Sequence, residues 1–294
     1  MLWGIDLGGT KIEGVVLDSP SAHSVRARLR LETEQENGYE HILSRIALLV
    51  EQLSSHVGET PQVLGIGTPG AFHPGTNLLR NSNTLCLNGK AIGSDLEKRL
   101  GCKVKIANDA NCFALAEAKL GAAQKCPSVF GVILGTGVGG GVVVEGKVLP
   151  GAQGICGEWG HNVIDPEGAQ CYCGKRGCVE ATISGPALED FYTERTGTKL
   201  RLQEIVERAG TKDPDARDTL ERLHHYFGKA IAVVINILDP HCIVLGGGVS
   251  NISSLYTEGQ RKIAPHLFTD SPEIRLIQNT LGDSAGVFGA ALLS

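Results

Sequence analysis

Short apolar runs alternate along the chain with stretches whose apolar residues recur at helical spacing. Ile42, Ile46, Leu49 and Leu53 lie three or four residues apart, which predicts an amphipathic helix over 39–57 that ends at Gly58. By the same criteria, further helices are expected at 112–121, 185–196, 200–209, 215–238 and from 287 to 293. The apolar runs predict strands at 2–7, 12–17, 63–67, 104–107, 130–134, 142–144 and 242–245.

The strand pairs at 2–17 and 130–144 share one plan: an apolar strand, a glycine-rich bend that contains a threonine, and a second apolar strand. This internal repeat predicts a duplicated domain with a phosphate-binding hairpin in each half. The bend at 135–141 also satisfies Gly-X-Gly-X-X-Gly, but a β-branched run follows it where the dinucleotide fingerprint requires a helix. We therefore expect the two bends to hold a nucleoside triphosphate, and not NAD.

The first bend carries residues suited to phosphate and magnesium. Gly8 and Gly9 would let backbone N–H groups approach a phosphate, because they have no side chain in the way. Asp6, Thr10 and Lys11 could hold a hydrated magnesium ion and a phosphate oxygen. The same residues also suit a plain hairpin with a Gly-Gly turn.

Polar or glycine-rich segments follow three later strands. The segment 80–89 is rich in amides, which can hydrogen-bond hydroxyls or simply satisfy turns. Asp109 stands between the strand at 104–107 and a helix, where a carboxylate can serve chemistry or cap the helix, and position alone favours the cap. A third glycine-rich loop, at 246–250, suits close packing against a flat ring or a ribose, or else a tight strand-to-helix turn.

Four soft metal ligands gather between two carboxylates, Glu158 and Glu180. Gly174 and Gly177 let the chain turn back, so that all the ligands can reach one point. The ligands are one imidazole and three thiols: His161, Cys171, Cys173 and Cys178. The spacing is not Cys-X-X-Cys, and four protein ligands fill a tetrahedron, so the segment predicts a structural zinc ion and not a redox pair or a hydrolytic metal. The alternative is a set of unliganded thiols.

Length, composition and charge narrow the class. A chain of 294 residues has room for two domains, and 42% hydrophobic content with few aromatic residues is ordinary for an α/β enzyme. No window approaches the roughly 20 apolar residues of a spanning helix. No signal peptide is recognised either, so we expect a cytoplasmic protein. A net charge of −5 without a basic stripe argues against nucleic acid. Five scattered cysteines read as reduced thiols: Cys86, Cys102, Cys112, Cys126 and Cys242.

Six motifs make the chain resemble the ROK family of bacterial sugar kinases, within the actin-like ATPase (ribonuclease H-like) fold. They are Asp-Leu-Gly-Gly-Thr-Lys, Asn-Asp-Ala-Asn, Leu-Gly-Thr-Gly-Val-Gly-Gly-Gly, Gly-Glu-Trp-Gly-His, Cys-Tyr-Cys-Gly-Lys-Arg-Gly-Cys-Val-Glu and Val-Leu-Gly-Gly-Gly-Val-Ser. The resemblance covers nearly the whole chain and implies two duplicated α/β domains that flank a cleft. We expect a smaller domain at 1–115 plus 281–294, and a larger one at 116–280 that carries the zinc segment 161–178.

The resemblance also implies the activity and the role of each site residue. The family transfers the γ-phosphoryl group of ATP to a hexose hydroxyl, here the 6-OH, with Asp109 as general base and Asp6 organising Mg²⁺. The residues expected to contact the nucleotide are Gly8, Gly9, Thr10, Lys11, Gly135, Thr136, Gly137, Gly246, Gly247 and Gly248. Those expected to hold the sugar are Asn83, Asn108, Asp109, Glu158, His161 and Glu180. One ring nitrogen of His161 would ligate zinc and leave the other for a sugar hydroxyl.

The identity of the sugar rests on two segments that look most like the fructokinase or mannokinase branch of the family. These are residues 81–89 and the Glu-Trp-Gly-His-Asn sequence at 158–162, so fructose or mannose is expected, with N-acetylglucosamine and glucose as alternatives. A sugar-responsive ROK repressor would carry an N-terminal helix-turn-helix, for which the first strand at Leu2 leaves no room. A zinc-stabilised binding module without turnover is disfavoured by the presence of Asp6, Thr10, Asp109 and Thr136. Family analogy implies a homodimer.

Overall fold

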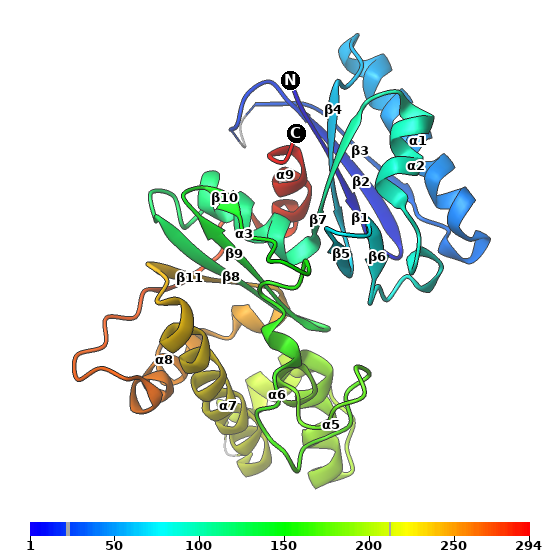
Figure 1. Ribbon diagram of the computed structural model, residues 1–294. Coiled ribbons are helices and arrows are strands. Elements are labelled where there is room, and N and C mark those ends of the chain that lie inside the picture. The colour runs from blue at the N-terminus through cyan, green and yellow to red at the C-terminus, as the bar shows by residue number, and fades with distance from the viewer. Residues whose placement is uncertain (22–23, 212) are drawn as a thin grey trace. The chain divides into compact units, whose positions relative to one another are not determined.

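The structure, a computed structural model, describes residues 1–21, 24–211 and 213–294, and its contacts gather into two compact units (Figure 1). Unit 1 contains Met1–Pro127, Gly141–Cys156 and Thr280–Ser294, and unit 2 contains Ser128–Gly140 and Gly157–Asn279. The sequence predicts a smaller domain at 1–115 plus 281–294 and a larger domain at 116–280. That these segments fold as separate domains stays a prediction.

Unit 1 is built on a five-stranded sheet in the order β3-β2-β1-β4-β7. The strands are β1 (Leu2–Leu7), β2 (Lys11–Leu17), β3 (Val25–Glu32), β4 (Val63–Thr68) and β7 (Lys103–Asn108). β1 runs antiparallel to β2 and parallel to β4, and β4 runs parallel to β7. The carboxyl ends of β1, β4 and β7 therefore meet at one edge, which is where sheets of this kind place their ligands.

Helices cover both faces of this sheet, namely α1 (Tyr39–Val57), α2 (Ile92–Leu100), α3 (Asp109–Lys119) and α9 (Ala285–Ala291). The apolar face of α1 is buried as its spacing predicts, and the helix ends at Gly58 in the left-handed conformation. A side chain at Gly14 would lie 2.7 Å from Leu53, so α1 packs closely on that face of β2. A short hairpin of β5 (Ala71–His73) and β6 (Leu78–Arg80) extends the unit.

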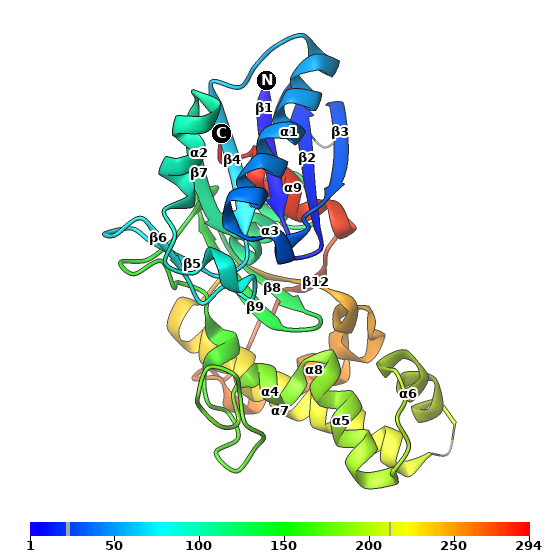
Figure 2. The same ribbon diagram turned by 90° about the vertical axis from the view of Figure 1, so that its right-hand side faces the viewer.

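The opposite face of the sheet is covered by α9, as Figure 2 shows. A Cβ atom at Gly4 or at Gly65 would overlap the backbone of α9, so these two glycines allow the helix to lie directly on β1 and β4. Successive residues of a strand point to opposite faces. Asp6 therefore shares the α9 face with Gly4, while Ile5 points into the core beneath α1.

The second sheet has the order β10-β9-β8-β11-β12. Its strands are β8 (Ser128–Leu134), β9 (Val138–Val144), β10 (Lys147–Val148), β11 (Cys242–Gly246) and β12 (Leu276–Gln278). β11 pairs in parallel with β8 and β12. The strands of both predicted glycine-rich hairpins are thus confirmed, but the second bend is shorter than expected. Only residues 135–137 form it, because Gly139, Gly140 and Gly141 belong to β9.

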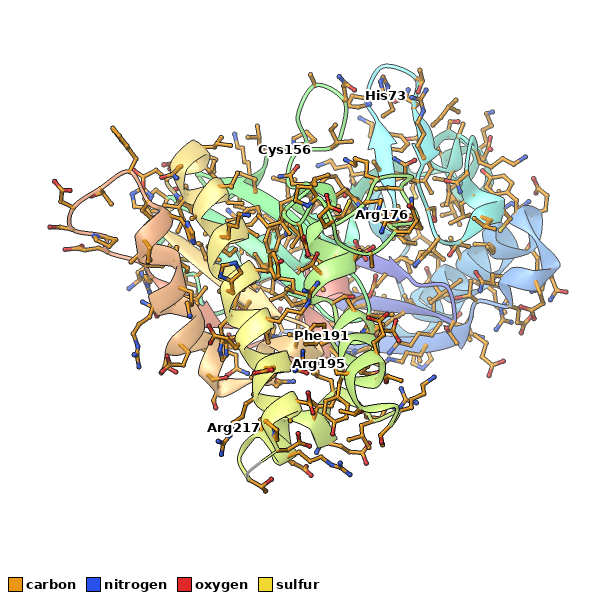
Figure 3. The ribbon with its side chains drawn as sticks, turned by 90° about the horizontal axis from the view of Figure 1, so that it is seen from below. His73, Cys156, Arg176, Phe191, Arg195 and Arg217 are labelled. Carbon is orange, nitrogen blue, oxygen red and sulfur yellow. The ribbon has the colours of Figure 1, made fainter. Side chains whose placement is uncertain are left out.

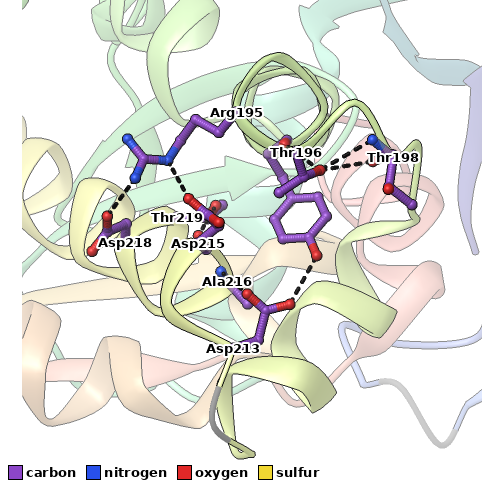
Figure 4. A network of polar contacts seen from close by, with 9 residues as sticks. Arg195, Thr196, Thr198, Asp213, Asp215, Ala216, Asp218 and Thr219 are labelled. Carbon is purple, nitrogen blue, oxygen red and sulfur yellow. Dashed lines mark hydrogen bonds and ion pairs between the residues drawn. The ribbon is translucent and has the colours of Figure 1, made fainter.

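The helices of unit 2 are α4 (Val179–Ile183), α5 (Gly185–Thr196), α6 (Leu202–Ala209), α7 (Pro214–Leu238) and α8 (Glu258–Ile263). Polar contacts join α5 to the start of α7 (Figure 4). Arg195 donates from Nε to Asp215 over 2.9 Å and from an Nη to Asp218 over 2.7 Å, while the Tyr192 hydroxyl donates to Asp213 over 2.8 Å. Asp213 also caps α7, so this network fixes where the longest helix begins.

Among the residues that the structure describes, no helix is long and apolar enough to cross a membrane. The strands and long helices expected from the apolar pattern are present with bounds shifted by a few residues at most. The sequence analysis did not predict the strands β3, β5, β6, β10 and β12 or the helices α2, α4 and α8.

Candidate active site and metal centre

The first glycine-rich bend is held from below by a residue that the sequence reading missed. The N–H of Gly8 donates to the Lys11 carbonyl over 3.0 Å and closes the turn. The hydroxyl of the fully buried Thr33 donates to the Gly8 carbonyl over 2.7 Å, and its N–H donates to the Thr10 carbonyl over 2.9 Å. The segment after β3 is therefore part of the support of the bend.

Asp6 lies at the carboxyl edge of the sheet, enclosed by two glycines. A Cβ atom at Gly286 would lie 2.8 Å from one oxygen of Asp6, and a Cβ atom at Gly67 would lie 3.6 Å from the other. Burial, followed by the nearby Asp109 and Glu13 carboxylates, raises the pKa of Asp6 to about 6, against the opposing effect of Lys11. A carboxylate that would gain from a cation is what a magnesium site requires.

The cap of α3 is Asn108, and not Asp109 as position alone favoured. Its side-chain oxygen accepts from the N–H of Ala110 over 2.8 Å and from the N–H of Asn111 over 3.4 Å. Its amide nitrogen donates to the Gly70 carbonyl over 3.1 Å, so both ends of the side chain are engaged. Because Asn108 supplies the cap, the Asp109 carboxylate is not needed for capping and is available to contact a substrate.

Asp109 opens α3 with an exposed side chain whose Oδ1 accepts from the N–H of Ala110 over 2.8 Å. Protein packed around it raises the pKa of the carboxyl group, and this N–H acts in the opposite direction. The exposed surface limits the cost of holding a charge, so an ionised carboxylate near neutral pH is compatible with the environment. The carboxylates of Asp6 and Asp109 repel each other, which places both in one electrostatic site within unit 1.

The amide-rich segment at 80–89 resolves into two kinds of asparagine. Asn88 satisfies a turn, since it accepts from the N–H of Ser82 over 2.8 Å and donates to the Ser82 carbonyl over 2.9 Å. Asn83 is exposed. The alternative that asparagines here serve turns is therefore right for Asn88, while Asn83 remains available to a ligand.

Two glycine-rich loops lie side by side in unit 2. The N–H of Gly135 donates to the Gly137 carbonyl over 2.9 Å, and a Cβ atom at Gly135 would lie 3.8 Å from the nitrogen of Gly248. Thr136, Gly247 and Gly248 are exposed, whereas Gly246 is the buried end of β11. The exposed residues are the part of this pair that a nucleotide can touch.

Glu180 supports the loop at 135–137 from the other side. One of its carboxylate oxygens accepts from the N–H of Val138 over 2.8 Å, and a Cβ atom at Gly137 would lie 2.6 Å from the same oxygen. Glu180 also lies in the first turn of α4, whose N-cap is Cys178. It therefore joins the glycine-rich loop to the cysteine-containing segment, a link that the sequence did not reveal.

The candidate ligand atoms of His161, Cys171, Cys173 and Cys178 all lie within 4.8 Å of one another. The Sγ atoms of Cys173 and Cys178 are 3.5 Å apart, and the Sγ atom of Cys171 is 3.7 Å from His161 Nδ1. Zinc–sulfur bonds of about 2.3 Å at tetrahedral angles place sulfurs about 3.8 Å apart. The donor set and its spacing therefore fit a tetrahedral Zn²⁺.

The fold of this segment depends on glycine and on a tyrosine. Gly174 and Gly177 have φ of 90° and 62°, and a Cβ atom at Gly177 would overlap the Asp165 carbonyl. While Nδ1 of His161 faces the thiols, Nε2 lies 3.0 Å from the hydroxyl of Tyr172. Tyr172 thus occupies the direction in which a sugar hydroxyl was expected, and the sequence had not singled it out.

A pocket of about 620 Å³ opens within unit 2 between the metal segment and α5. Its lining includes Thr136, Glu180, Tyr172 and Arg222, together with Arg176 and Phe191, which Figure 3 labels. The guanidinium of Arg222 lies 4.9 Å from the ring centroids of both Phe191 and Tyr226 and 3.7 Å from Asp165. The pocket therefore reaches from the glycine-rich loop at 135–137 to the zinc segment 161–178. Its lining residue Arg222 is held in place by these contacts with Phe191, Tyr226 and Asp165.

Comparison with known proteins identifies the family, because the model of the ROK family matches residues 2–294. The chain belongs to the ROK family. It is 38% identical over 305 residues to an N-acetyl-D-glucosamine kinase of Pasteurella multocida, covering 100% of this chain and 99% of the relative. A ROK hexokinase of Thermus thermophilus has a TM-score of 0.89 at 34% identity, covering 100% and 97% of the two chains. A ROK glucokinase of Streptomyces griseus, solved with glucose and AMPPNP, has a TM-score of 0.80 at 29% identity and covers 100% and 98%.

Membership of the ROK family confirms the fold class and the general activity expected from the motifs. The two sheets flanked by helices match ROK sugar kinases of the actin-like ATPase fold, and the chain is an ATP-dependent sugar kinase. Fructose, the sugar favoured by the sequence reading, finds no support in these comparisons. Segments 81–89 and 158–162, on which fructose rested, do not record which substituents the sugar bears.

The predicted site residues divide between the two units. Unit 1 carries Asp6, the bend 8–11, Asn83, Asn108 and Asp109, and unit 2 carries the loops 135–137 and 246–248, Glu158, Glu180 and the metal segment. That the two groups act on one pair of substrates stays a prediction.

Proposed function

We propose that this ROK kinase phosphorylates the 6-hydroxyl of N-acetylglucosamine with ATP. The observation that carries the proposal is the 38% identity, over the whole chain, to an N-acetyl-D-glucosamine kinase. Glucose is the second candidate, on the likeness to the glucokinase solved with glucose.

In this proposal Asp109 accepts the proton of the attacking 6-hydroxyl, since it is an exposed carboxylate that no longer has to cap α3. Phosphoryl transfer is mainly positioning and charge neutralisation, so a base of ordinary strength within hydrogen-bond reach is enough. Asn83, Asn108, Glu158 and Glu180 would orient the sugar through its hydroxyls. Fixed polar groups of this kind reject an analogue that lacks one hydroxyl, because they would be left unpaired.

The bends at 8–11 and 135–137 and the loop at 246–248 would hold the nucleotide, with backbone N–H groups toward its phosphates. Asp6 and Thr10 would hold Mg²⁺, whose contribution when bound is to neutralise phosphate charge. The raised pKa of Asp6 fits this role, since the repulsion from Asp109 and Glu13 is relieved by a cation.

The zinc site would be structural, because its four protein ligands leave no open position for chemistry. It would keep His161, and with it Glu158 and Glu180 at the two ends of the segment, in place for the sugar. We therefore regard the metal as a support of substrate binding.

A panel of sugars with coupled detection of ADP tests the proposal. N-acetylglucosamine is expected to give the highest kcat/KM, ahead of glucose, mannose and fructose, and the product should carry its phosphate on O6. A higher kcat/KM for fructose would reject the proposed substrate. Sugar binding without any release of ADP would instead favour a non-catalytic, sugar-responsive regulator.

A further inference from the structure

Glu117 is a fully buried acid in the helix that carries Asp109, and neither the motifs nor the proposed mechanism gives it a role. Its carboxylate accepts from the N–H groups of Ala122, Leu281 and Thr280 over 2.8, 2.9 and 3.1 Å. The Thr280 hydroxyl lies 3.4 Å from it. Within the described part of the chain, no cationic side chain forms a salt bridge with Glu117. Three backbone donors converging on one buried carboxylate form a strong, directional clamp.

The clamp joins two distant parts of unit 1. Glu117 lies two turns after Asp109 on α3, whereas Thr280 and Leu281 begin the last segment of the unit and lead into α9. Such a clamp fixes the position of α9 along α3, because the backbone at 280–281 enters α9 only a few residues later.

Helices α3 and α9 also determine the surroundings of the carboxylates of Asp6 and Asp109. A Cβ atom at Gly289 of α9 would overlap the carbonyl oxygen of Cys112 on α3, so the two backbones are in direct contact. Gly286 of α9 lies against Asp6, with its would-be Cβ atom 2.8 Å from the carboxylate. A shift of α9 relative to α3 therefore moves the surroundings of Asp6 with respect to Asp109.

We propose that Glu117 is a positioning residue for phosphoryl transfer: by holding residues 280–281 to the end of α3, it sets the register of α9 against α3 and thereby aligns Asp6 with Asp109. The inference rests on the proposed roles of these two carboxylates. It differs from a purely structural role in one respect, since a structural residue would affect folding without a selective loss of the chemical step.

Two substitutions break the clamp by independent routes. Glu117→Gln keeps the shape but replaces one acceptor oxygen with an NH₂ group that faces backbone donors. Gly121→Ala leaves the carboxylate intact, but its new Cβ atom would overlap Glu117 Oε2 and displace it. The backbone at Gly121 has no positive φ, although the new Cβ atom would also approach Glu117 Cα to 3.0 Å. Gly210→Ala is the matched control, because Gly210 also follows a helix without positive φ, and its Cβ atom would meet only the Glu207 carbonyl at 3.3 Å.

The experiment compares the three full-length variants with the wild type for kcat, KM for N-acetylglucosamine, Mg²⁺ dependence and amide hydrogen exchange at 280–281. We expect both clamp variants to lose protection at 280–281. Their kcat should fall by about tenfold to a hundredfold, as for a misplaced catalytic group, with KM for the sugar changed less than kcat. The Mg²⁺ concentration for half-maximal rate should rise, because Asp6 is displaced, and Gly210→Ala should match the wild type.

Loss of protection with an unchanged kcat would overturn the inference, as would a fall in kcat with protection retained. Should one clamp variant fail to fold, the other decides. Failure of both under conditions where Gly210→Ala stays folded would assign Glu117 a purely structural role and reject the proposal. If the wild type itself transfers phosphate to none of the sugars, the proposed function fails first, and the exchange data then report only whether the clamp exists.

Discussion

The most constrained single residue of the site is Asp6. It lies between Gly67 and Gly286, and a Cβ atom at Gly286 would approach its carboxylate to 2.8 Å, so a larger residue there would displace the carboxylate. Glu13, its cross-strand neighbour on β2, is itself buried and paired with Arg28 and with Arg30 over 3.0 Å. Asp6 therefore holds its charge in a partly negative environment, which costs folding energy and favours cation binding.

The pKa of Asp6 leads to a prediction about stability and pH. Because its pKa rises from 3.8 in an exposed setting to about 6 here, protonated Asp6 stabilises the fold, and this contribution is present below pH 4 and lost as the pH rises through 6. Asp6→Asn should therefore stabilise the protein at pH 7.5 by on the order of 2 kcal/mol, with no gain at pH 3.5, while abolishing turnover.

Thermal unfolding at both pH values, without added divalent cations, measures the effect. Asp18→Asn is the control, since Asp18 is exposed and pairs with Arg26 at the surface over 3.3 Å. An equal effect of Asp6→Asn at both pH values would show that charge at this position is not what destabilises the fold.

Some site residues could not have been found from the sequence. Thr33 and Tyr172 act through contacts with residues 25 and 11 positions away, and no local pattern records such contacts. Asp109 was identified by its motif, but the cap of α3 was assigned to it because the sequence shows two adjacent cap-forming residues. The backbone direction that chooses Asn108 is set by the pairing of β7 with β4.

At the scale of elements, the start of α3 depends on one side chain with two duties. Asn108→Ala should destabilise the protein by about 1 kcal/mol through loss of the cap. Asn108→Ser restores a capping oxygen but lacks the longer amide group that donates to Gly70 and would reach a sugar, so it should recover stability and not sugar affinity. Denaturant unfolding and calorimetric titration with N-acetylglucosamine separate the two. Recovery of both properties by serine would remove Asn108 from the sugar site.

Loss of the metal ion from the zinc segment 161–178 should also affect residues outside that segment. Cys173→Ser, or removal of metal by a chelator, is expected to lower thermal stability and to weaken sugar binding together, because the turns at 171–178 would lose the ion that joins their ligands. Cys126→Ser, a cysteine outside the cluster, is the control. Metal content by elemental analysis should give one zinc per chain. A metal-free Cys173→Ser protein with normal sugar affinity would contradict the supporting role.

Elements with their own local signals were the ones predicted well. α1 shows a clear apolar face and a glycine stop, and both hairpins show strand, glycine bend, strand. One exception is β3, which alternates apolar with charged residues over Val25–Glu32; this period-2 pattern indicates a half-buried strand and was overlooked. The predicted second bend, 135–141, is too long because glycines such as Gly140 and Gly141 are typical of loops. They are glycines since a Cβ atom at Gly140 would lie 2.7 Å from Trp159, and one at Gly141 2.6 Å from the Ala110 carbonyl.

For the whole molecule, family analogy predicts a homodimer, a proposal that rests on no contact described above. Analytical ultracentrifugation should then give about twice the chain mass of 31.0 kDa at micromolar concentration. A single species at the chain mass would reject the dimer and leave the assignment of the site residues within each unit untouched.

In the proposed function, Asp109 accepts the proton in phosphoryl transfer to an N-acetylated sugar. The most direct test measures N-acetylglucosamine binding by calorimetry and ADP release in the same preparation of Asp109→Ala. We predict sugar affinity within a few-fold of the wild type and a kcat lower by about 10² to 10⁴, as expected for loss of a general base. An Asp109→Ala variant that releases ADP at a near-normal rate would show that Asp109 is not the general base.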